Sequence, residues 1–170
     1  HTLEFEQVLA TAREVRRLAP EVFIIVGGHA AAAFSGPLED SAVDAVMVED
    51  GESLMPLLAG CLERREPLEQ VPGLRLRRPD GWQSTPRLEE RPALDLVPLP
   101  ARDLVKQYRN GYHCLLFKPV WLIETARGCP HRCSFCSVWQ LYDRTCRERS
   151  MEAVVEDFAE SGDAVFVADD

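Results

Sequence analysis

The sequence predicts an α/β fold in which helices alternate with parallel strands, and two apolar runs carry that prediction. Residues 22–26 form one unbroken apolar run, and residues 42–48 form a second run that is mostly apolar. Such runs are typical of strands that are buried on both faces. Apolar residues at helical spacing precede, separate and follow them. Because such alternation builds a parallel sheet covered by helices, we expect this arrangement for residues 1–66.

Three helices are expected in residues 1–66, each from its apolar spacing and its end signals. The first ends at Pro20, and its apolar positions are Leu3, Phe5, Val8, Leu9, Ala12, Val15 and Leu18. A short alanine-rich helix over residues 29–34 closes at Gly36-Pro37. The third is expected to begin at Ser53, and its apolar face comprises Leu54, Leu57, Leu58, Cys61 and Leu62.

Residues 67–118 read as a β-hairpin followed by a proline-rich linker. Eight of the twelve prolines lie between Pro67 and Pro119. The turn signal Pro79-Asp80-Gly81 separates residues 71–78 from residues 83–87, which predicts a hairpin. We expect residues 93–108 to be a linker with one helix that starts near Ala101.

Residues 119–170 show a second strand–helix–strand pattern. Residues 120–125 read as a strand, and residues 164–168 read as the next one. Between them, Ser150 is the expected N-cap and Gly162 the expected stop of a helix, whose apolar face comprises Met151, Val154, Val155 and Phe158. Three cysteines directly follow the first strand, at the end where (β/α) barrels place their catalytic residues.

Composition limits the classes of function that the chain can have. The net charge of −9 argues against general binding to nucleic acid or to anionic membranes. No apolar run reaches the length of a spanning helix, and no signal peptide is visible at the start. Six cysteines without a secretory context favour a reducing, cytoplasmic location. Because the chain begins at His1 and stops just after a strand, we expect it to be part of a longer protein.

The most informative feature is a cluster of three cysteines, Cys129, Cys133 and Cys136, within eight residues. Three thiolates on one loop suit an iron–sulfur centre, and they leave one iron of a four-iron cluster open to a ligand that is not protein. Zinc is the nearest alternative, but it takes four ligands, usually as two separated pairs, and His131 as a fourth ligand would crowd the loop.

This loop closely resembles the signature of the radical S-adenosylmethionine (SAM) superfamily, Cys-x3-Cys-x2-Cys with an aromatic residue before the last cysteine. Phe135 is that aromatic residue, and residues 123–130 match the usual lead-in. The resemblance implies a 4Fe-4S cluster held by the three cysteines, with the adenine of SAM beside Phe135. Reductive cleavage of SAM would then give a 5′-deoxyadenosyl radical. Where many members have Gly-Gly-Glu to hold the SAM amino group, this chain has Asp169-Asp170, so Asp169 is the implied substitute.

The first half resembles the C-terminal part of a cobalamin (B12)-binding Rossmann-like domain. The matching stretches are residues 23–30 and 48–52, which precede the cysteine loop in the order found in the B12-binding branch of radical SAM enzymes. The resemblance implies that Gly27 and Gly28 face the nucleotide tail of cobalamin, with Gly51 and Glu52 near the same edge. The Asp-x-His-x-x-Gly motif that supplies a lower cobalt ligand in some B12 proteins does not occur here.

The resemblances together imply part of a B12-domain-containing radical SAM enzyme. Its expected parts are the end of a Rossmann-like cobalamin domain (1–66), a hairpin and linker (67–118), and the first βαβ of a partial (β/α) TIM-like barrel (119–170). The implied reaction is methyl transfer or oxidative cyclisation of a small molecule, with electrons from a flavodoxin or ferredoxin. The alternatives are a methylthiotransferase-like radical SAM protein, whose N-terminal domain has three further cysteines where this chain has only Cys61, and a non-catalytic zinc or iron–sulfur module.

Overall fold

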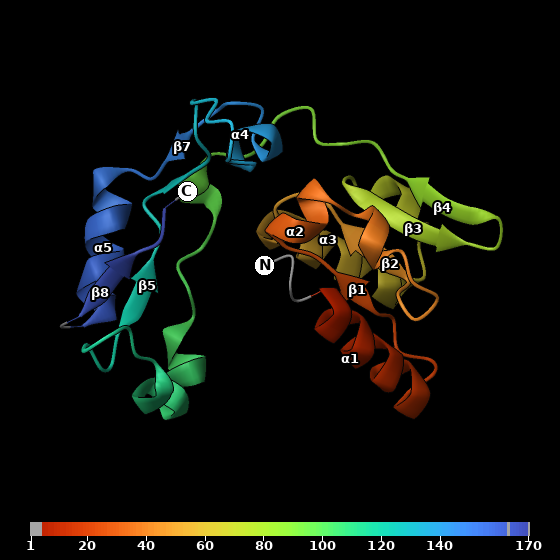
Figure 1. Cartoon of the computed structure of the whole chain (residues 1–170), viewed down its shortest axis with the longest axis horizontal. Helices are drawn as coiled ribbons and strands as arrows, with labels where there is room; N and C mark the ends of the chain where they lie inside the picture. Colours follow the sequence, from red (N-terminus) through yellow and green to blue (C-terminus); the bar gives the residue numbers. More distant parts are fainter. Residues whose placement is uncertain (1–4, 163, 170) are drawn as a thin grey trace. The chain divides into compact units, whose positions relative to one another are not determined.

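The computed structural model describes residues 5–162 and 164–169, which form two compact units that divide between Arg91 and Pro92. Figure 1 labels most of the helices and strands of each unit. Each unit is an α/β structure, so the coarse class predicted from the sequence is confirmed. Among the described residues, no helix is long and apolar enough to cross a membrane.

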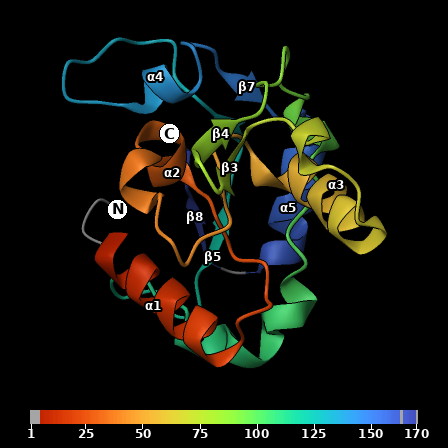
Figure 2. The ribbon, with the colours of Figure 1, turned by 90° about the vertical axis from the view of Figure 1, so that its right-hand side faces the viewer.

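The first unit is built on one four-stranded sheet of mixed direction, in the order β1-β2-β3-β4. Strand β1 (Ile25–Val26) runs parallel to β2 (Ala45–Met47), as the sequence predicted. Strands β3 (Leu74–Arg78) and β4 (Gly81–Ser84) form the predicted hairpin, and β3 pairs antiparallel with β2. The hairpin therefore continues the sheet that β1 and β2 begin, and Figure 2 shows β3 and β4 side by side from a second direction.

The helices of the first unit cover the two faces of this sheet, and β2 provides both cores by its alternation. Ala45 and Met47 pack against α3 (Gly51–Arg64) in a core with Leu54, Leu58, Cys61, Val71, Leu74 and Leu76. Val46 points to the opposite core, which takes in Ala12 of α1 (Phe5–Leu18), Ala31 of α2 (His29–Ala33), and Leu38, Ala42 and Val43. Two short 3-10 turns, η2 (Gly36–Leu38) and η3 (Leu68–Gln70), complete the unit.

Two elements of the first unit differ from the sequence-based expectation. Helix α3 begins at Gly51 with Asp50 as its N-cap, so Ser53 lies inside its first turn. The apolar run at residues 22–26 forms a strand only at Ile25–Val26, and these residues are half-buried. Strand β1 lies at the edge of the described sheet, so only one neighbour fixes its length and its burial.

The second unit has a parallel pair of strands, β5 (Trp121–Ile123) and β8 (Val165–Val167), connected through α5 (Met151–Ser161). The predicted caps of α5 are confirmed: the Ser150 hydroxyl accepts a hydrogen bond from the Ala153 N–H, and Gly162 follows the last turn. The remaining elements are η4 (Leu94–Leu96), η5 (Arg102–Gly111), β6 (Ala126–Arg127), α4 (Val138–Leu141) and β7 (Arg147–Glu148).

An ion pair holds helix α5 against η5. Asp157 and Ser161 are buried, and Arg102 of η5 donates to the Asp157 carboxylate at 2.5 Å. Arg102 also donates to the carbonyl oxygen of Leu122 at 3.1 Å, so η5, β5 and α5 meet at one guanidinium. By contrast, the apolar residues Met151, Val155 and Phe158 of the same helix are exposed.

Candidate metal centre and cofactor sites

The cysteine loop leaves β5 and returns at a short antiparallel clasp. Strands β6 and β7 pair Ala126 with Glu148 and Arg127 with Arg147, so the 19 residues from 128 to 146 form a closed loop. Gly128 opens this loop at φ +94°, and a Cβ there would lie 2.4 Å from the carbonyl oxygen of Thr145. Only glycine fits this close crossing of the two chain segments.

All three predicted ligand cysteines are free thiols on this loop. Cys133 is exposed, Cys129 and Cys136 are half-buried, and the Cys136 N–H donates to the carbonyl oxygen of Cys133 at 3.1 Å. Within residues 5–162 and 164–169, no three His, Cys, Asp or Glu side chains are arranged to hold a metal ion. Three thiols are suitable ligands for an iron–sulfur cluster. In this structure they do not surround a common point.

The arginines in the loop and directly before it have different partners. Arg127 is buried and donates twice to Glu124, at 2.8 Å and 2.7 Å, so its charge is already balanced. The Arg132 guanidinium lies 5.6 Å from the centre of the Trp139 ring, a cation–π distance. Phe135 of the loop is 91% exposed, so its ring is accessible to a ligand.

Asp169 lies at the end of β8 and clamps the entry to the cysteine loop. Its Oδ1 accepts hydrogen bonds from the N–H groups of Thr125 (2.7 Å) and Ala126 (3.1 Å), and its Oδ2 accepts one from the Thr125 hydroxyl (2.5 Å). Burial alone would raise the pKa of Asp169, but these three hydrogen bonds outweigh burial and lower it. Asp170, the other residue named from the sequence at this place, lies outside the described residues.

The linker braces the returning side of the loop. Arg147 and Arg149 donate to the carbonyl oxygens of Pro92 (2.9 Å) and Val97 (3.0 Å), and Asp95 accepts from the Ser150 N–H at 2.8 Å. Sequence reasoning missed this brace because its partners lie more than 50 residues apart. The only local signal is the pair of arginines two positions apart on an extended segment.

An open pocket of about 340 Å³ follows the third cysteine. Its lining residues are Trp139, Gln140, Asp143 and Arg144. Asp143 and Arg144 both have positive φ, at 50° and 59°, which is a costly backbone conformation for two successive residues that are not glycine.

The four residues named for cobalamin lie at the carboxyl ends of neighbouring parallel strands. Gly27 and Gly28 directly follow β1, while Gly51 and Glu52 form the first turn of α3 after β2. A Cβ on Gly27 or on Gly51 would approach Met47 to within 3.6 Å and 3.7 Å, so both glycines lie against the same side chain. Gly28 has φ +105° and no heavy atom near its missing Cβ, so its backbone is open to a ligand.

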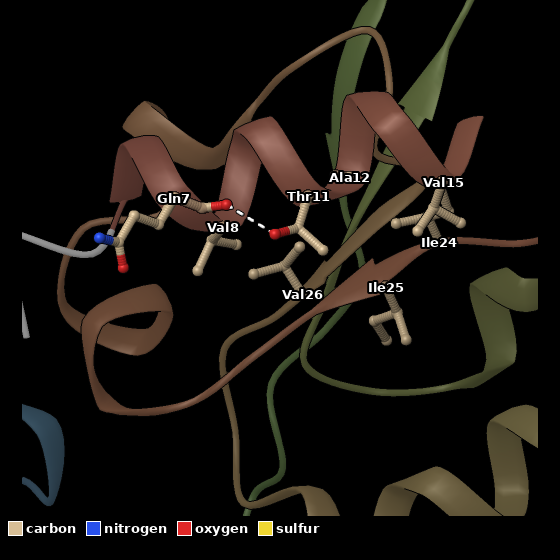
Figure 3. A pocket seen from close by; sticks show the side chains of 8 residues that line it. All are labelled: Gln7, Val8, Thr11, Ala12, Val15, Ile24, Ile25 and Val26. Atoms are coloured by element: carbon tan, nitrogen blue, oxygen red, sulfur yellow. Dashed lines mark hydrogen bonds between the residues drawn. The ribbon is translucent and has the colours of Figure 1, made fainter. Parts of the chain in front are cut away.

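A second pocket, in the first unit, is apolar. It has a volume of about 400 Å³ between α1 and β1, and Figure 3 shows its lining residues Gln7, Val8, Thr11, Ala12, Val15, Ile24, Ile25 and Val26. In this view the Thr11 hydroxyl donates to the carbonyl oxygen of Gln7, which satisfies it within the helix. The polar side chains that line the pocket do not point to a common site, so the pocket is suited to apolar contact rather than to catalysis.

Comparison with known proteins gives relatives over nearly the whole chain, although no protein-family model matches it. Hopanoid C-3 methylase of Methylococcus capsulatus is 36% identical over 170 residues, which is 96% of this chain and 32% of that protein. Anaerobic magnesium-protoporphyrin IX monomethyl ester cyclase of Rubrivivax gelatinosus is 28% identical over 158 residues, which is 89% of this chain and 27% of that protein. The chain thus spans about a third of the length of the curated relatives it matches.

Solved structures agree in fold. The radical SAM methyltransferase TsrM from Kitasatospora setae, solved with tryptophan substrate and a SAM analogue, superposes with a TM-score of 0.72 at 18% identity, over 98% of this chain and 33% of that one. The cobalamin-dependent SAM radical enzyme OxsB, solved with aqua-cobalamin and SAM, superposes with a TM-score of 0.71 at 19% identity, over 100% of this chain and 24% of that one. The chain is therefore similar in sequence to about a third of a hopanoid methylase and of a protoporphyrin ester cyclase, and similar in fold to part of two radical SAM enzymes.

Proposed function

We propose that the loop from Gly128 to Cys146 holds a 4Fe-4S cluster through Cys129, Cys133 and Cys136. The observation that carries this proposal is the set of three free thiols on one clasped loop that directly follows β5. Thiolates are the ligands that iron–sulfur clusters select, and all other cysteines of the chain lie off the short segment from 129 to 136. With cluster and SAM bound, these groups supply one-electron cleavage of a carbon–sulfur bond and a 5′-deoxyadenosyl radical.

The chain's own residues would support this chemistry by position. The β6–β7 pairing holds the two ends of the loop together, and Asp169 fixes the segment that leads into it. Fewer backbone conformations therefore have to be ordered when a cluster binds. The exposed ring of Phe135 is free to lie against the adenine of SAM. The Arg127–Glu124 pair keeps a buried cation balanced beneath the loop.

For the first unit we propose cobalamin binding at the carboxyl ends of β1 and β2. The open backbone of Gly28 supports this, as does the approach of Gly27 and Gly51 to Met47. In open α/β sheets, ligands bind at this edge of the strands. With both cofactors, the longer enzyme would methylate or cyclise a small-molecule substrate, as the names of the relatives indicate for those proteins. A flavodoxin or ferredoxin would supply the electron.

Iron and sulfide content after anaerobic reconstitution tests the cluster proposal. Wild type should bind about four irons and four sulfides per chain. Cys129→Ser, Cys133→Ser and Cys136→Ser should each lose most of this iron. Cys146→Ser is the matched control, because Cys146 is an exposed cysteine in the same unit that lies outside the segment from 129 to 136, and it should keep the wild-type content. One zinc and no sulfide in wild type, or equal iron loss in the control, would contradict the proposal.

Corrinoid retention tests the cobalamin proposal separately. The chain incubated with cobalamin should carry corrinoid absorbance through gel filtration. Gly28→Val should abolish retention, because it adds a side chain where the backbone is open, while Gly81→Val is the control, with a positive φ of +133° and equal space around its missing Cβ. Wild type without absorbance would refute cobalamin binding by this chain and leave the cluster proposal standing.

A further inference from the structure

An exposed apolar hairpin tip precedes β5 in the second unit. The backbone of Cys114 and Phe117 exchanges two hydrogen bonds, at 3.1 Å and 2.9 Å, around Leu115 and Leu116. At its base the Val120 N–H donates to the carbonyl oxygen of Tyr112 at 3.2 Å. The Tyr112 ring packs on Trp121 with centroids 5.5 Å apart. The hairpin is therefore held by its own backbone and anchored to β5.

The three residues Leu115, Leu116 and Phe117, called the apolar tip below, are presented to solvent. Their exposed fractions are 91%, 98% and 64%. Leu115 has φ +52°, a conformation that costs a residue with a Cβ about 1 kcal/mol. Exposed clusters of large apolar side chains and strained turns are both concentrated where a protein meets a partner, a ligand or a membrane.

The segment that carries the apolar tip differs in charge from the chain as a whole. The chain has a net charge of −9, yet residues 104–123 contain no Asp or Glu and three cations, Lys106, Arg109 and Lys118. The side chains of Lys106 and Lys118 are exposed. The exposed residues Leu104 and Tyr108 of η5 add further apolar and aromatic surface. Basic, aromatic and apolar side chains on one exposed segment match the chemistry of a membrane–water interface.

We propose that the apolar tip inserts into the surface of an anionic lipid bilayer, with Lys106 and Lys118 at the level of the headgroups. Insertion would remove three large apolar side chains from water, and the cations would gain from anionic headgroups. Apolar insertion and attraction of the cations to anionic lipid would act together. The hairpin enters the amino end of β5, whereas the cysteine loop leaves its carboxyl end, so contact with lipid would leave the loop accessible (Figure 1).

Vesicle sedimentation tests this inference, which does not depend on the proposed function. The probes are vesicles of phosphatidylcholine alone and of phosphatidylcholine with about a third phosphatidylglycerol. Wild type should pellet with the anionic vesicles, less with the neutral ones and less at high salt. Leu115→Ser/Leu116→Ser should lower the partition coefficient about tenfold or more, and Lys106→Glu/Lys118→Glu should do so on the anionic vesicles only.

Leu96→Ser is the matched control, because Leu96 is 75% exposed in the same unit but lies outside residues 104–123. It should bind vesicles as wild type does. Thermal unfolding of each variant checks that the substitutions leave the fold intact, as their exposure predicts. If wild type fails to bind either vesicle, or if Leu96→Ser weakens binding as much as the tip variants, the inference is wrong. Self-association through the tip without vesicle binding would also overturn it.

Discussion

The carboxylate of Asp169 accepts a hydrogen bond from the backbone N–H of Thr125 at 2.7 Å, across the ends of the parallel strands β8 and β5. The resemblance to radical SAM enzymes implied that Asp169 contacts the amino group of SAM. In the structure its two oxygens already accept three hydrogen bonds from the segment that leads into the cysteine loop. Asp169, which follows β8, therefore positions Thr125 and Ala126, which follow β5.

Loss of this carboxylate should loosen the entry to the loop. Asp169→Asn removes the charge and one acceptor, so the Thr125 and Ala126 amides should exchange hydrogen about tenfold faster, as expected for the loss of about 1–2 kcal/mol. Thr125→Val removes only the hydroxyl donor at Oδ2 and should give a smaller change of the same sign. Hydrogen exchange read by NMR measures both.

The same two variants separate positioning from SAM binding. If Asp169 acts by positioning, Thr125→Val weakens SAM binding in proportion to its effect on exchange. A SAM contact without positioning predicts that Asp169→Asn loses SAM affinity while exchange at Thr125 stays at the wild-type rate. That second result would refute the positioning role.

Gly128 should be the least replaceable residue of the loop. Gly128→Ala places a Cβ 2.4 Å from the Thr145 carbonyl oxygen at φ +94°, so the β6–β7 clasp has to open or shift. We expect a loss of about 2–3 kcal/mol in the free energy of unfolding of the second unit. Gly111→Ala is the control, since nothing lies within 4 Å of its missing Cβ. Equal stability of the two variants in urea would contradict the geometry of the clasp.

Asp44 should make the first unit sensitive to acid. Burial alone would raise the pKa of Asp44, but hydrogen bonds from the Ile24 N–H, Arg77 and Arg16 outweigh burial and lower it. A carboxyl with a lowered pKa stabilises the fold above its unfolded pKa, and this contribution disappears as pH falls through the folded value. Protection of the β2 amides should therefore drop below about pH 4.

Asp44→Asn isolates this contribution from the other carboxylates. At neutral pH the variant should lose about 2 kcal/mol of β2 protection, because three donors, two of them charged, lose an ionised acceptor. The difference should shrink as pH falls below about 4 and disappear below the lowered folded pKa of Asp44, since protonation then removes the charge in both. A difference that is constant from pH 7 to pH 3 would show that the charge of Asp44 is not responsible.

The sequence predicted well the features that local chemistry decides. Pro20 ends α1 near the expected place, and Ser150 caps α5 through its own hydroxyl. The pairing of β6 with β7 could not be predicted, because two-residue strands have no periodicity and their partners are about 20 residues apart. The start of α3 was placed at Ser53 because serine is a common N-cap, yet the chain turns into the helix already after Asp50.

Side-chain partners far apart in sequence were also beyond reach. The ion pair between Arg102 and Asp157 joins residues 55 positions apart. The net charge of −9 concealed the basic segment 104–123, because a sum over the chain removes local sign.

The measurement that tests the central claim most directly is the electron paramagnetic resonance spectrum of the reconstituted, dithionite-reduced chain with and without SAM. Three cysteine ligands leave one iron open, so the chain should show the signal of a reduced 4Fe-4S cluster, and SAM should change that signal. Cys146→Ser should behave as wild type does. A chain without a cluster signal, or a signal that SAM leaves unchanged, would contradict the assignment of Cys129, Cys133 and Cys136 as the ligands of an open-site cluster.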